Sequence, residues 1–342
     1  MLDLAEGPRV AVAFLLAAAL TAATVPTAIA TARRTGFLDA PVGYKAHRQP
    51  TPYLGGAAVI VATGLAILLV GDGIGHYWPL LLGTLGLGLV GTVDDRVNLS
   101  PWLRVGMEVL VAWLLWSQDL GWSFLDGGAA NLLLTAFWVT GIVNAFNLMD
   151  NLDGAASSVG AVSAAGVAVL ALIGDDLALA VVAVALCGAL VGFLRYNLAE
   201  PARIFLGDGG SMAIGMLLAG ALMEVPMGQL TDWSALSAAA LIVGLPVFDT
   251  TLVVLSRRRR GAPVLSGATD HTTHRLRAFL KSPRAVAATL AVTQLALVGL
   301  AIEATRLGPE AVVALVAFAL LLGTAMIVAA DGSRWTPVSD DS

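Results

Sequence analysis

Apolar runs long enough to cross a lipid bilayer fill most of this sequence, and they restrict its fold more than any other feature. A transmembrane helix needs about 20 mainly apolar residues. Hydrophobic residues make up 58% of the chain and charged residues only 13%, against about 25% charged in soluble proteins. We therefore expect an all-α, polytopic integral membrane protein with about eleven transmembrane helices. The runs lie at about 10–31, 54–71, 78–93, 101–118, 130–147, 155–174, 176–196, 211–228, 234–256, 285–304 and 308–330.

No polar linker divides the chain, so residues 1–342 are predicted to form a single membrane domain that ends in a polar tail at 331–342. The first run exceeds the roughly 7–15 residues of a signal-peptide core, which favours a retained first helix. The single cysteine, Cys187, lies in an apolar run and is expected to be a small buried hydrophobe. The net charge of −5 gives no indication of a nucleic-acid partner.

Basic residues are concentrated in alternate loops. Most of the 19 Lys and Arg residues follow odd-numbered runs, and the loops after even-numbered runs hold only Arg306. Cytoplasmic loops are enriched in Lys and Arg. We therefore predict that the odd loops are cytoplasmic, that the N-terminus lies outside, and that the C-terminus lies inside.

The unusual polar motifs fall in the same odd loops, although only Lys and Arg were used to orient the chain. Grouped acidic, amide and histidine side chains of this kind are candidates for a site on the cytoplasmic face. They are Lys45 and His47 in the first odd loop, Asp94 and Asp95 in the second, Asn147, Asp150 and Asp153 in the third, Asp208 in the fourth, and His271, His274 and Arg275 in the fifth.

The chemistry of these groups favours a divalent cation and a diphosphate. Adjacent carboxylates repel each other unless a cation lies between them, and Mg²⁺ prefers oxygen ligands together with substrate phosphates. Asp208 lies in a Gly-Asp-Gly-Gly-Ser turn before a helix, whose free N–H groups are expected to face an anion. Asp150 and Asp153 would share one face with Asn147 if that segment were helical.

Each motif alone has a structural alternative. An Asp-Asp pair is often a solvated helix end, a Gly-Asp-Gly segment is often only a turn, and the two histidines could be interfacial residues. The arginine run 257–260 is expected to be a topology anchor at the lipid headgroups. Glu108 and Asp249 lie within apolar runs and could pack helices together or line a cavity. The convergence of five loops on one membrane face favours the functional interpretation of the set.

In order and spacing, the motifs resemble those of the polyprenyl-phosphate N-acetylhexosamine-1-phosphate transferases of glycosyltransferase family 4. The resemblance covers about residues 35–285 and rests on Asp-Asp, Asn-x-x-Asp-x-x-Asp-Gly, Gly-Asp-x-Gly-Ser and His-x-x-His-Arg. The Lys-x-His-x-x-Pro-Thr-Pro segment and the His-Arg-Leu ending look more like the undecaprenyl- and decaprenyl-phosphate GlcNAc-1-phosphate transferases than the related phospho-MurNAc-pentapeptide translocase.

The resemblance implies transfer of GlcNAc-1-phosphate from a UDP-sugar to polyprenyl phosphate, with release of UMP, as the first membrane step of a cell-envelope glycan. It also implies Mg²⁺, with Mn²⁺ as an alternative, and the bacterial plasma membrane. By position, the resemblance implies that Asp94 or Asp95 acts as a base or positioning group, and that Asp208 and Asn147 bind the metal. It implies that Asp150 and Asp153 contact the nucleotide or the metal, and that Lys45 and His47 lie on the nucleotide side. It also implies that His271, His274 and Arg275 contact the sugar or the phosphates.

The chain departs from the resembling motifs at two positions, where Asn151 replaces a glycine and Thr273 replaces a histidine. The second change leaves the donor sugar open, so UDP-MurNAc-pentapeptide remains an alternative donor. A transporter of lipid-linked sugars is a further alternative, but it would place its polar groups near the bilayer midplane. The oligomeric state is not fixed by the sequence, and a homodimer is one of the states it allows.

Overall fold

The structure is a computed structural model that describes residues 6–39, 50–226, 232–263 and 270–331. Helices dominate it, with a short 3-10 helix, η1 (Ile74–Tyr77), and a two-stranded antiparallel sheet of β1 (Leu38–Asp39) and β2 (Thr51–Pro52). The helices are α1 (Glu6–Thr35), α2 (Gly55–Val70), α3 (Trp78–Val97), α4 (Pro101–Ser117), α5 (Gly128–Met149), α6 (Ala155–Ile173), α7 (Leu177–Asn197), α8 (Gly207–Glu224), α9 (Asp232–Ile242), α10 (Gly244–Arg260), α11 (Thr272–Leu280), α12 (Pro283–Leu307) and α13 (Pro309–Asp331).

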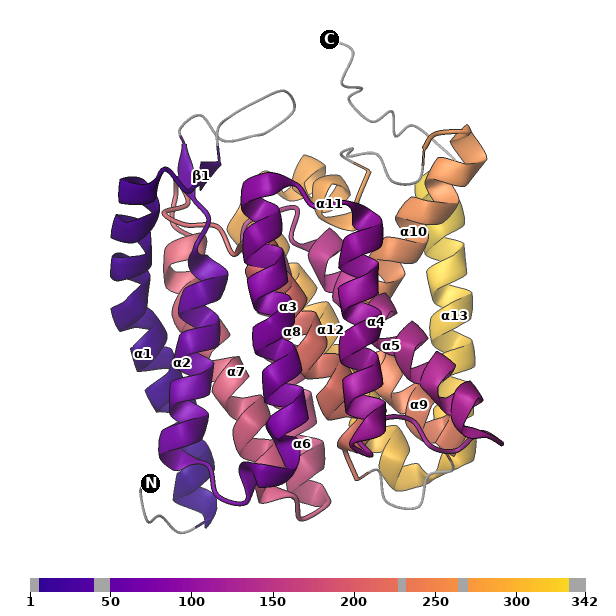
Figure 1. Ribbon diagram of the computed structural model, residues 1–342. Helices are drawn as coiled ribbons and strands as arrows, with labels where there is room; N and C mark the ends of the chain where they lie inside the picture. The colour runs from indigo at the N-terminus through magenta and orange to yellow at the C-terminus, as the bar shows by residue number, and fades with distance from the viewer. Residues whose placement is uncertain (1–5, 40–49, 227–231, 264–269, 332–342) are drawn as a thin grey trace.

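The helices form an upright bundle of the kind expected for a multi-pass membrane protein (Figure 1). Within the described residues, seven helices are long and apolar enough to cross a membrane, or up to eight if one bent pair counts as a single span. Each of the eleven predicted runs contains a helix, but some, such as the 16-residue α2, are short. The protein is therefore a helical multi-pass membrane protein, and the number eleven stays a prediction.

The predicted span at 234–256 is divided in the structure, where α9 and α10 meet at an angle of 82°. Pro246 has no N–H to bond the carbonyl of Ile242 four residues earlier. That carbonyl instead accepts hydrogen bonds from Ser163 Oγ at 2.7 Å and from Gln294 Nε2 at 2.5 Å. Gln294 also accepts from the backbone N–H of Leu245 at 3.2 Å, so buried side chains replace the helical hydrogen bonds at the break.

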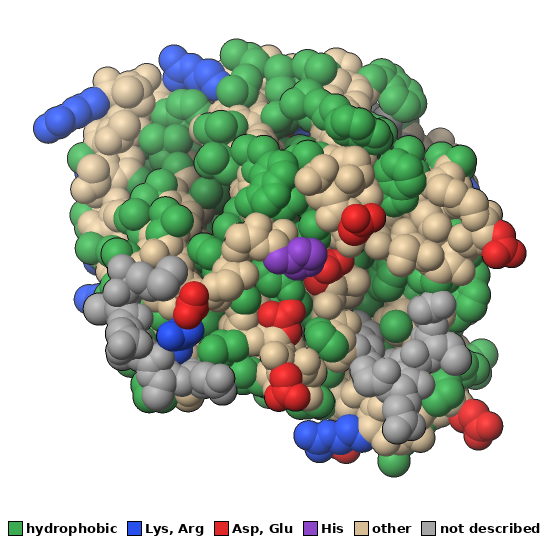
Figure 2. All heavy atoms as spheres, turned by 60° about the horizontal axis from the view of Figure 1, so that its bottom comes forward, with side chains coloured by type: hydrophobic (Ala, Val, Ile, Leu, Met, Phe, Trp, Pro, Cys, Tyr) green, Lys and Arg blue, Asp and Glu red, His purple; other side chains and the backbone are tan. Residues whose placement is uncertain are grey.

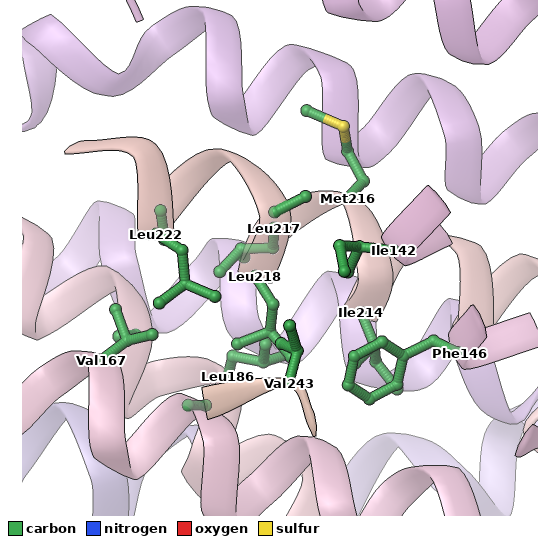
Figure 3. Packing of buried hydrophobic residues seen from close by; sticks show 14 of the residues in the cluster. Ile142, Phe146, Val167, Leu186, Ile214, Met216, Leu217, Leu218, Leu222 and Val243 are labelled. Carbon is green, nitrogen blue, oxygen red and sulfur yellow. The ribbon is translucent and has the colours of Figure 1, made fainter. Parts of the chain in front are cut away.

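α8 occupies the middle of the bundle, where α3, α5, α6 and α7 pack around it. Figure 3 shows Phe146 of α5 and Ile214 of α8 within one apolar cluster, with Val167 of α6 and Leu186 of α7 in the same cluster. Nearly every residue of α8 is buried, whereas α13 exposes most of its apolar surface at the edge of the molecule. The chain segment that carries Asp208 is thus held by packing on all sides.

Candidate active site

Close helix packing brings the acidic segments together at the end of the bundle where β1 and α11 lie (Figure 1). A methyl group added at Gly91 of α3 would lie 2.4 Å from the carbonyl oxygen of Asp208, and one added at Gly56 of α2 would lie 2.2 Å from the backbone nitrogen of Gly210. These distances are shorter than van der Waals contact, so only glycine lets the backbones approach so closely. The packing sets the end of α3, with Asp94 and Asp95, beside the first turn of α8.

Arg104, on the first turn of α4, lies at the centre of this group. Its Nη1 donates to Asp94 Oδ2 at 2.7 Å and to Asp208 Oδ2 at 3.2 Å, and its Nη2 donates to Asn147 Oδ1 at 2.7 Å. The guanidinium is a planar fork with five N–H donors, which suits it to bind several oxygens at fixed angles. One cation therefore joins side chains from α3, α5 and α8.

Asn147 and Asp94 are fixed from their other sides. The Nδ2 of Asn147 donates to Asp208 Oδ1 at 2.8 Å and to Ser211 Oγ at 3.1 Å. Asp94 Oδ1 accepts the backbone N–H of Leu99 at 2.5 Å. The Asp94 side chain is 7% exposed and that of Asp208 is 34% exposed, so Asp208 is the carboxylate of this pair that a ligand reaches more readily.

The first turn of α8 is not open to an anion, which corrects the prediction made from its glycine-rich sequence. Asp95 accepts the backbone N–H groups of Asp208 at 3.0 Å and of Gly209 at 3.4 Å. The N–H of Gly207 donates to the carboxylate of Asp150. Two carboxylates of the chain thus occupy the positive end of the helix dipole, and Asp95 orients the segment that carries Asp208.

Asp150 and Asp153 do not share a helical face, because α5 ends at Met149 and Asp153 lies in the turn before α6. They are nevertheless near the site. Burial raises the pKa of Asp150 well above its usual range, and the charges of Asp208, Asp95 and Asp153 raise it further. Burial also raises the pKa of Asp208 to about 6, although Arg104 opposes the shift.

This concentration of negative charge suits a divalent cation. Among the described residues, no three His, Cys, Asp or Glu side chains form a ready metal-binding group. Mg²⁺, however, usually takes one or two protein carboxylates and completes its shell with phosphates and water. The carboxylate of Asp208 and the amide oxygen of Asn147 are hard oxygen donors that could hold such a cation, although both accept from Arg104 in this structure.

The α11 segment adds the histidines. His271 Nδ1 lies 2.8 Å from Asp249 Oδ2, and Asp249 Oδ1 accepts the N–H of Thr272 at 2.6 Å. The buried Asp249 of α10 thus orients His271 and caps the start of α11. Thr273 donates to Asn151, the neighbour of Asp150, and so links α11 to the acidic loop.

Comparison with known proteins identifies the family. The sequence profile of glycosyl transferase family 4 matches residues 77–225. The chain is 31% identical to the decaprenyl-phosphate N-acetylglucosaminephosphotransferase of Mycolicibacterium smegmatis, over 71% of this chain and 69% of that protein. It is 30% identical to the undecaprenyl-phosphate alpha-N-acetylglucosaminyl 1-phosphate transferase of Escherichia coli K12, over 82% of this chain and 80% of that protein.

The chain belongs to glycosyl transferase family 4. It is also 28% identical to a probable undecaprenyl-phosphate N-acetylglucosaminyl 1-phosphate transferase of Bacillus subtilis, over 81% of this chain and 79% of that protein. The resemblance inferred from the motifs is therefore confirmed. The region matched by the family profile includes Asp94, Asn147 and Asp208.

The structure brings some of the predicted site residues of this family 4 protein together and leaves others apart. Asp94, Asp95, Asn147 and Asp208 are joined by hydrogen bonds directly or through Arg104, and Asp150 and Asp153 border them. His271 and His274 belong to α11 and its start. Arg275 is buried, and its Nε donates to the backbone oxygen of Asp270 at 3.0 Å, so it holds its own segment in place. Lys45 and His47 lie outside the described residues.

Arg104 and Asp249 are candidate site residues that the sequence alone does not single out. In the sequence, Arg104 contributes only to the Lys and Arg count that predicts topology, and Asp249 is only a polar residue inside an apolar run. A sequence signal for Arg104 exists, because it lies ten residues after Asp94, at the start of the next helix. It lies beside the Asp-Asp motif once α3 and α4 turn back on each other. The signal for Asp249 was weaker, because its partner His271 lies 22 residues away.

Proposed function

We propose that this family 4 protein transfers GlcNAc-1-phosphate from UDP-GlcNAc to a polyprenyl phosphate and releases UMP. The observation that carries the proposal is the network in which Arg104 joins Asp94, Asn147 and Asp208 at one end of a membrane bundle. The printed names of the curated relatives, which are polyprenyl-phosphate N-acetylglucosamine transferases, support the same reaction.

The reaction exchanges one phosphorus–oxygen bond for another. An oxygen of the lipid phosphate attacks the sugar-bearing phosphorus of the diphosphate, and the bond from that phosphorus to the UMP oxygen breaks. Phosphoryl transfer depends mainly on positioning and charge neutralisation. Arg104 supplies fixed positive charge, Asp208 and Asn147 would hold Mg²⁺, and Asp94 and Asp95 hold Arg104 and the first turn of α8 in place. When bound, Mg²⁺ neutralises charge on the diphosphate.

The place of the network fits substrates that meet at a membrane surface. It lies at a bundle end, where a lipid phosphate and a soluble nucleotide can both arrive, and the same end carries the loops rich in Lys and Arg. We infer that this end faces the cytoplasm of a bacterial plasma membrane. A transporter would be expected to bind its cargo near the bilayer midplane instead.

A donor comparison with purified protein tests the proposal. Release of UMP is measured with polyprenyl phosphate, Mg²⁺ and either UDP-GlcNAc or UDP-MurNAc-pentapeptide, and the lipid product is identified by mass. The proposal expects UMP and lipid-linked GlcNAc diphosphate from UDP-GlcNAc alone. Turnover only with UDP-MurNAc-pentapeptide would move the protein to peptidoglycan synthesis, and no turnover with either donor would contradict the proposed transfer.

A further inference from the structure

A short chain of hydrogen bonds joins the loop after α5 to the start of α11. Thr273 donates its hydroxyl hydrogen to Asn151 Oδ1, and the same hydroxyl oxygen lies 3.3 Å from His274 Nδ1. Thr273 is fully buried, whereas His274 is partly exposed. The buried threonine therefore connects the acidic loop to a histidine that a ligand can reach.

The orientation of the Asn151 amide decides where the hydrogens lie. Asn151 Nδ2 donates to the backbone oxygen of Leu148 at 2.6 Å, which leaves Oδ1 as the atom facing Thr273. An amide oxygen can only accept, so it takes the one hydroxyl hydrogen that Thr273 has. The hydroxyl oxygen then acts as an acceptor toward His274, and this requires a hydrogen on Nδ1 of the ring.

The second ring nitrogen of His274 is thereby left as an acceptor. A neutral imidazole carries one ring hydrogen, so a hydrogen on Nδ1 leaves a free lone pair on Nε2. Burial lowers the pKa of His274, and nearby His271 lowers it further, although Asp249 and Asp270 oppose the shift. The lowered pKa favours the neutral ring near pH 7. A bare nitrogen pairs with a hydroxyl or an amide N–H, not with a phosphate oxygen, which is also an acceptor.

We propose that Asn151 and Thr273 hold His274 in the Nδ1-H tautomer, so that its Nε2 accepts a hydrogen bond from a hydroxyl or amide N–H group of the sugar nucleotide. The nature of the ligand rests on the proposed function, whereas the tautomer does not. Asn151 and Thr273 are the two positions at which this chain departs from the motifs it resembles, and here they bond to each other.

Nitrogen NMR of protein labelled with ¹⁵N-histidine tests the tautomer without any substrate. The chain has four histidines, and the signal missing from His274→Gln assigns the ring. We expect wild-type His274 to carry its hydrogen on Nδ1 at pH 7.5. Asn151→Ala frees the Thr273 hydroxyl to donate to Nδ1, so this variant should move the ring hydrogen to Nε2. A wild-type ring with its hydrogen on Nε2, or protonated on both nitrogens, would overturn the proposal.

Thr273→Val and Thr272→Val form a matched pair that isolates the hydroxyl. The Thr272 hydroxyl is buried and has no hydrogen-bond partner in the part of the chain that the structure describes, so Thr272→Val should leave tautomer and kinetics unchanged. Thr273→Val should lose the Nδ1-H preference and raise KM for the sugar nucleotide about threefold to tenfold, the size of one neutral hydrogen bond, with little change in kcat.

The two measurements separate the parts of the proposal. An unaltered tautomer in Thr273→Val would overturn the role of the threonine, and an altered tautomer with an unaltered KM would overturn the substrate contact. If the protein turned over no sugar nucleotide, the proposed function would fail, while the NMR result on the wild-type ring would still decide the tautomer.

Discussion

Arg104 binds one side chain from each of three helices, and one of them is the carboxylate of Asp208, which is 34% exposed. A fixed cation in this position stabilises the charge that develops on a transferred phosphoryl group. We expect Arg104→Ala to lower kcat by about 100-fold to 1,000-fold, measured as UMP release. Arg104→Lys should recover only part of the rate, because an ammonium group lacks the planar fork. A wild-type rate in Arg104→Ala would contradict the central role of this residue.

The acidic residues of the site could be predicted from sequence, but their partners could not. Asp94, Asn147 and Asp208 belong to recognisable motifs, and the structure joins them. The N–H groups predicted to be free at the start of α8 are instead bound by Asp150 and Asp95, because carboxylates distant in sequence fold back onto this turn. Local sequence shows that a turn offers donors, but it does not show which acceptor arrives there.

At the scale of helices, the contact between α3 and α8 positions the site, and Gly91 makes that contact possible. A methyl group at Gly91 would meet backbone atoms of Asp208 and Gly209 at 2.4–2.6 Å. We expect Gly91→Ala to separate the helices, to destabilise the fold by about 1–3 kcal/mol, and to lower activity more than tenfold. Thermal unfolding and UMP release measure the two effects.

Gly86 provides the matched control for this prediction. It lies on the same helix, and a methyl group there would meet nothing within 4 Å. Gly86→Ala should leave activity unchanged and should not destabilise the fold, since alanine is the better helix former. Equal effects of the two substitutions would show that the close approach of α3 to α8 is not what positions the site.

The junction of α10 and the segment before α11 depends on a buried ion pair. Asp270 accepts from Arg257 Nη2 at 2.7 Å and from Arg260 Nη2 at 2.7 Å. Arg257 is buried, so the prediction that it anchors the chain at the lipid headgroups is wrong for this arginine. Burial would raise the pKa of Asp270, but the hydrogen bonds from Arg257 and the nearby Arg260 outweigh it and lower the pKa from 3.8 to about 2.

The sign of this shift predicts how stability changes with pH. A carboxylate whose pKa is lower in the folded state contributes fully above its unfolded pKa, and the contribution is lost as the pH falls through the folded value. We expect Asp270→Asn to lower the free energy of unfolding by about 3–5 kcal/mol at pH 7. The difference from wild type should shrink between about pH 4 and pH 2. A difference that did not change with pH would contradict the ion-pair account.

The helices themselves were largely predictable, whereas the break between α9 and α10 was not predicted. The apolar run from 234 to 256 predicts one span, and Gly244 and Pro246 within it do not by themselves indicate a bend of 82°. The bend persists because Ser163 and Gln294, from α6 and α12, bond the carbonyl that Pro246 leaves free. Such compensation comes from helices far away in sequence, which hydropathy does not report.

At the scale of the whole molecule, the two ends of the bundle differ in charge. Figure 2 shows acidic side chains gathered around a histidine at the end opposite the site, with few basic groups among them. His76 lies in η1, and its Nε2 lies 3.2 Å from Glu224 Oε2. The orientation that we propose rests on Lys and Arg, and it would put the site on the cytoplasmic side of the membrane.

Cysteine labelling tests the orientation directly. The single native cysteine, Cys187, is buried and should not react. Glu200, at the site end, and Asp72, at the opposite end, have side chains that are 58% and 60% exposed. A membrane-impermeant maleimide should label Asp72→Cys in intact cells, and should label Glu200→Cys only after lysis. The reverse pattern would place the site outside the cell.

The proposed transfer depends on the carboxylate of Asp208, which Arg104 binds. The most direct measurement is the rate of UMP release and of lipid-linked product from UDP-GlcNAc by wild type, Asp208→Asn and Asp72→Asn, with thermal unfolding as the check on folding. We expect Asp208→Asn to remain folded and to lose at least about 100-fold in rate, while Asp72→Asn keeps the wild-type rate. A folded Asp208→Asn that works as fast as wild type would contradict the account.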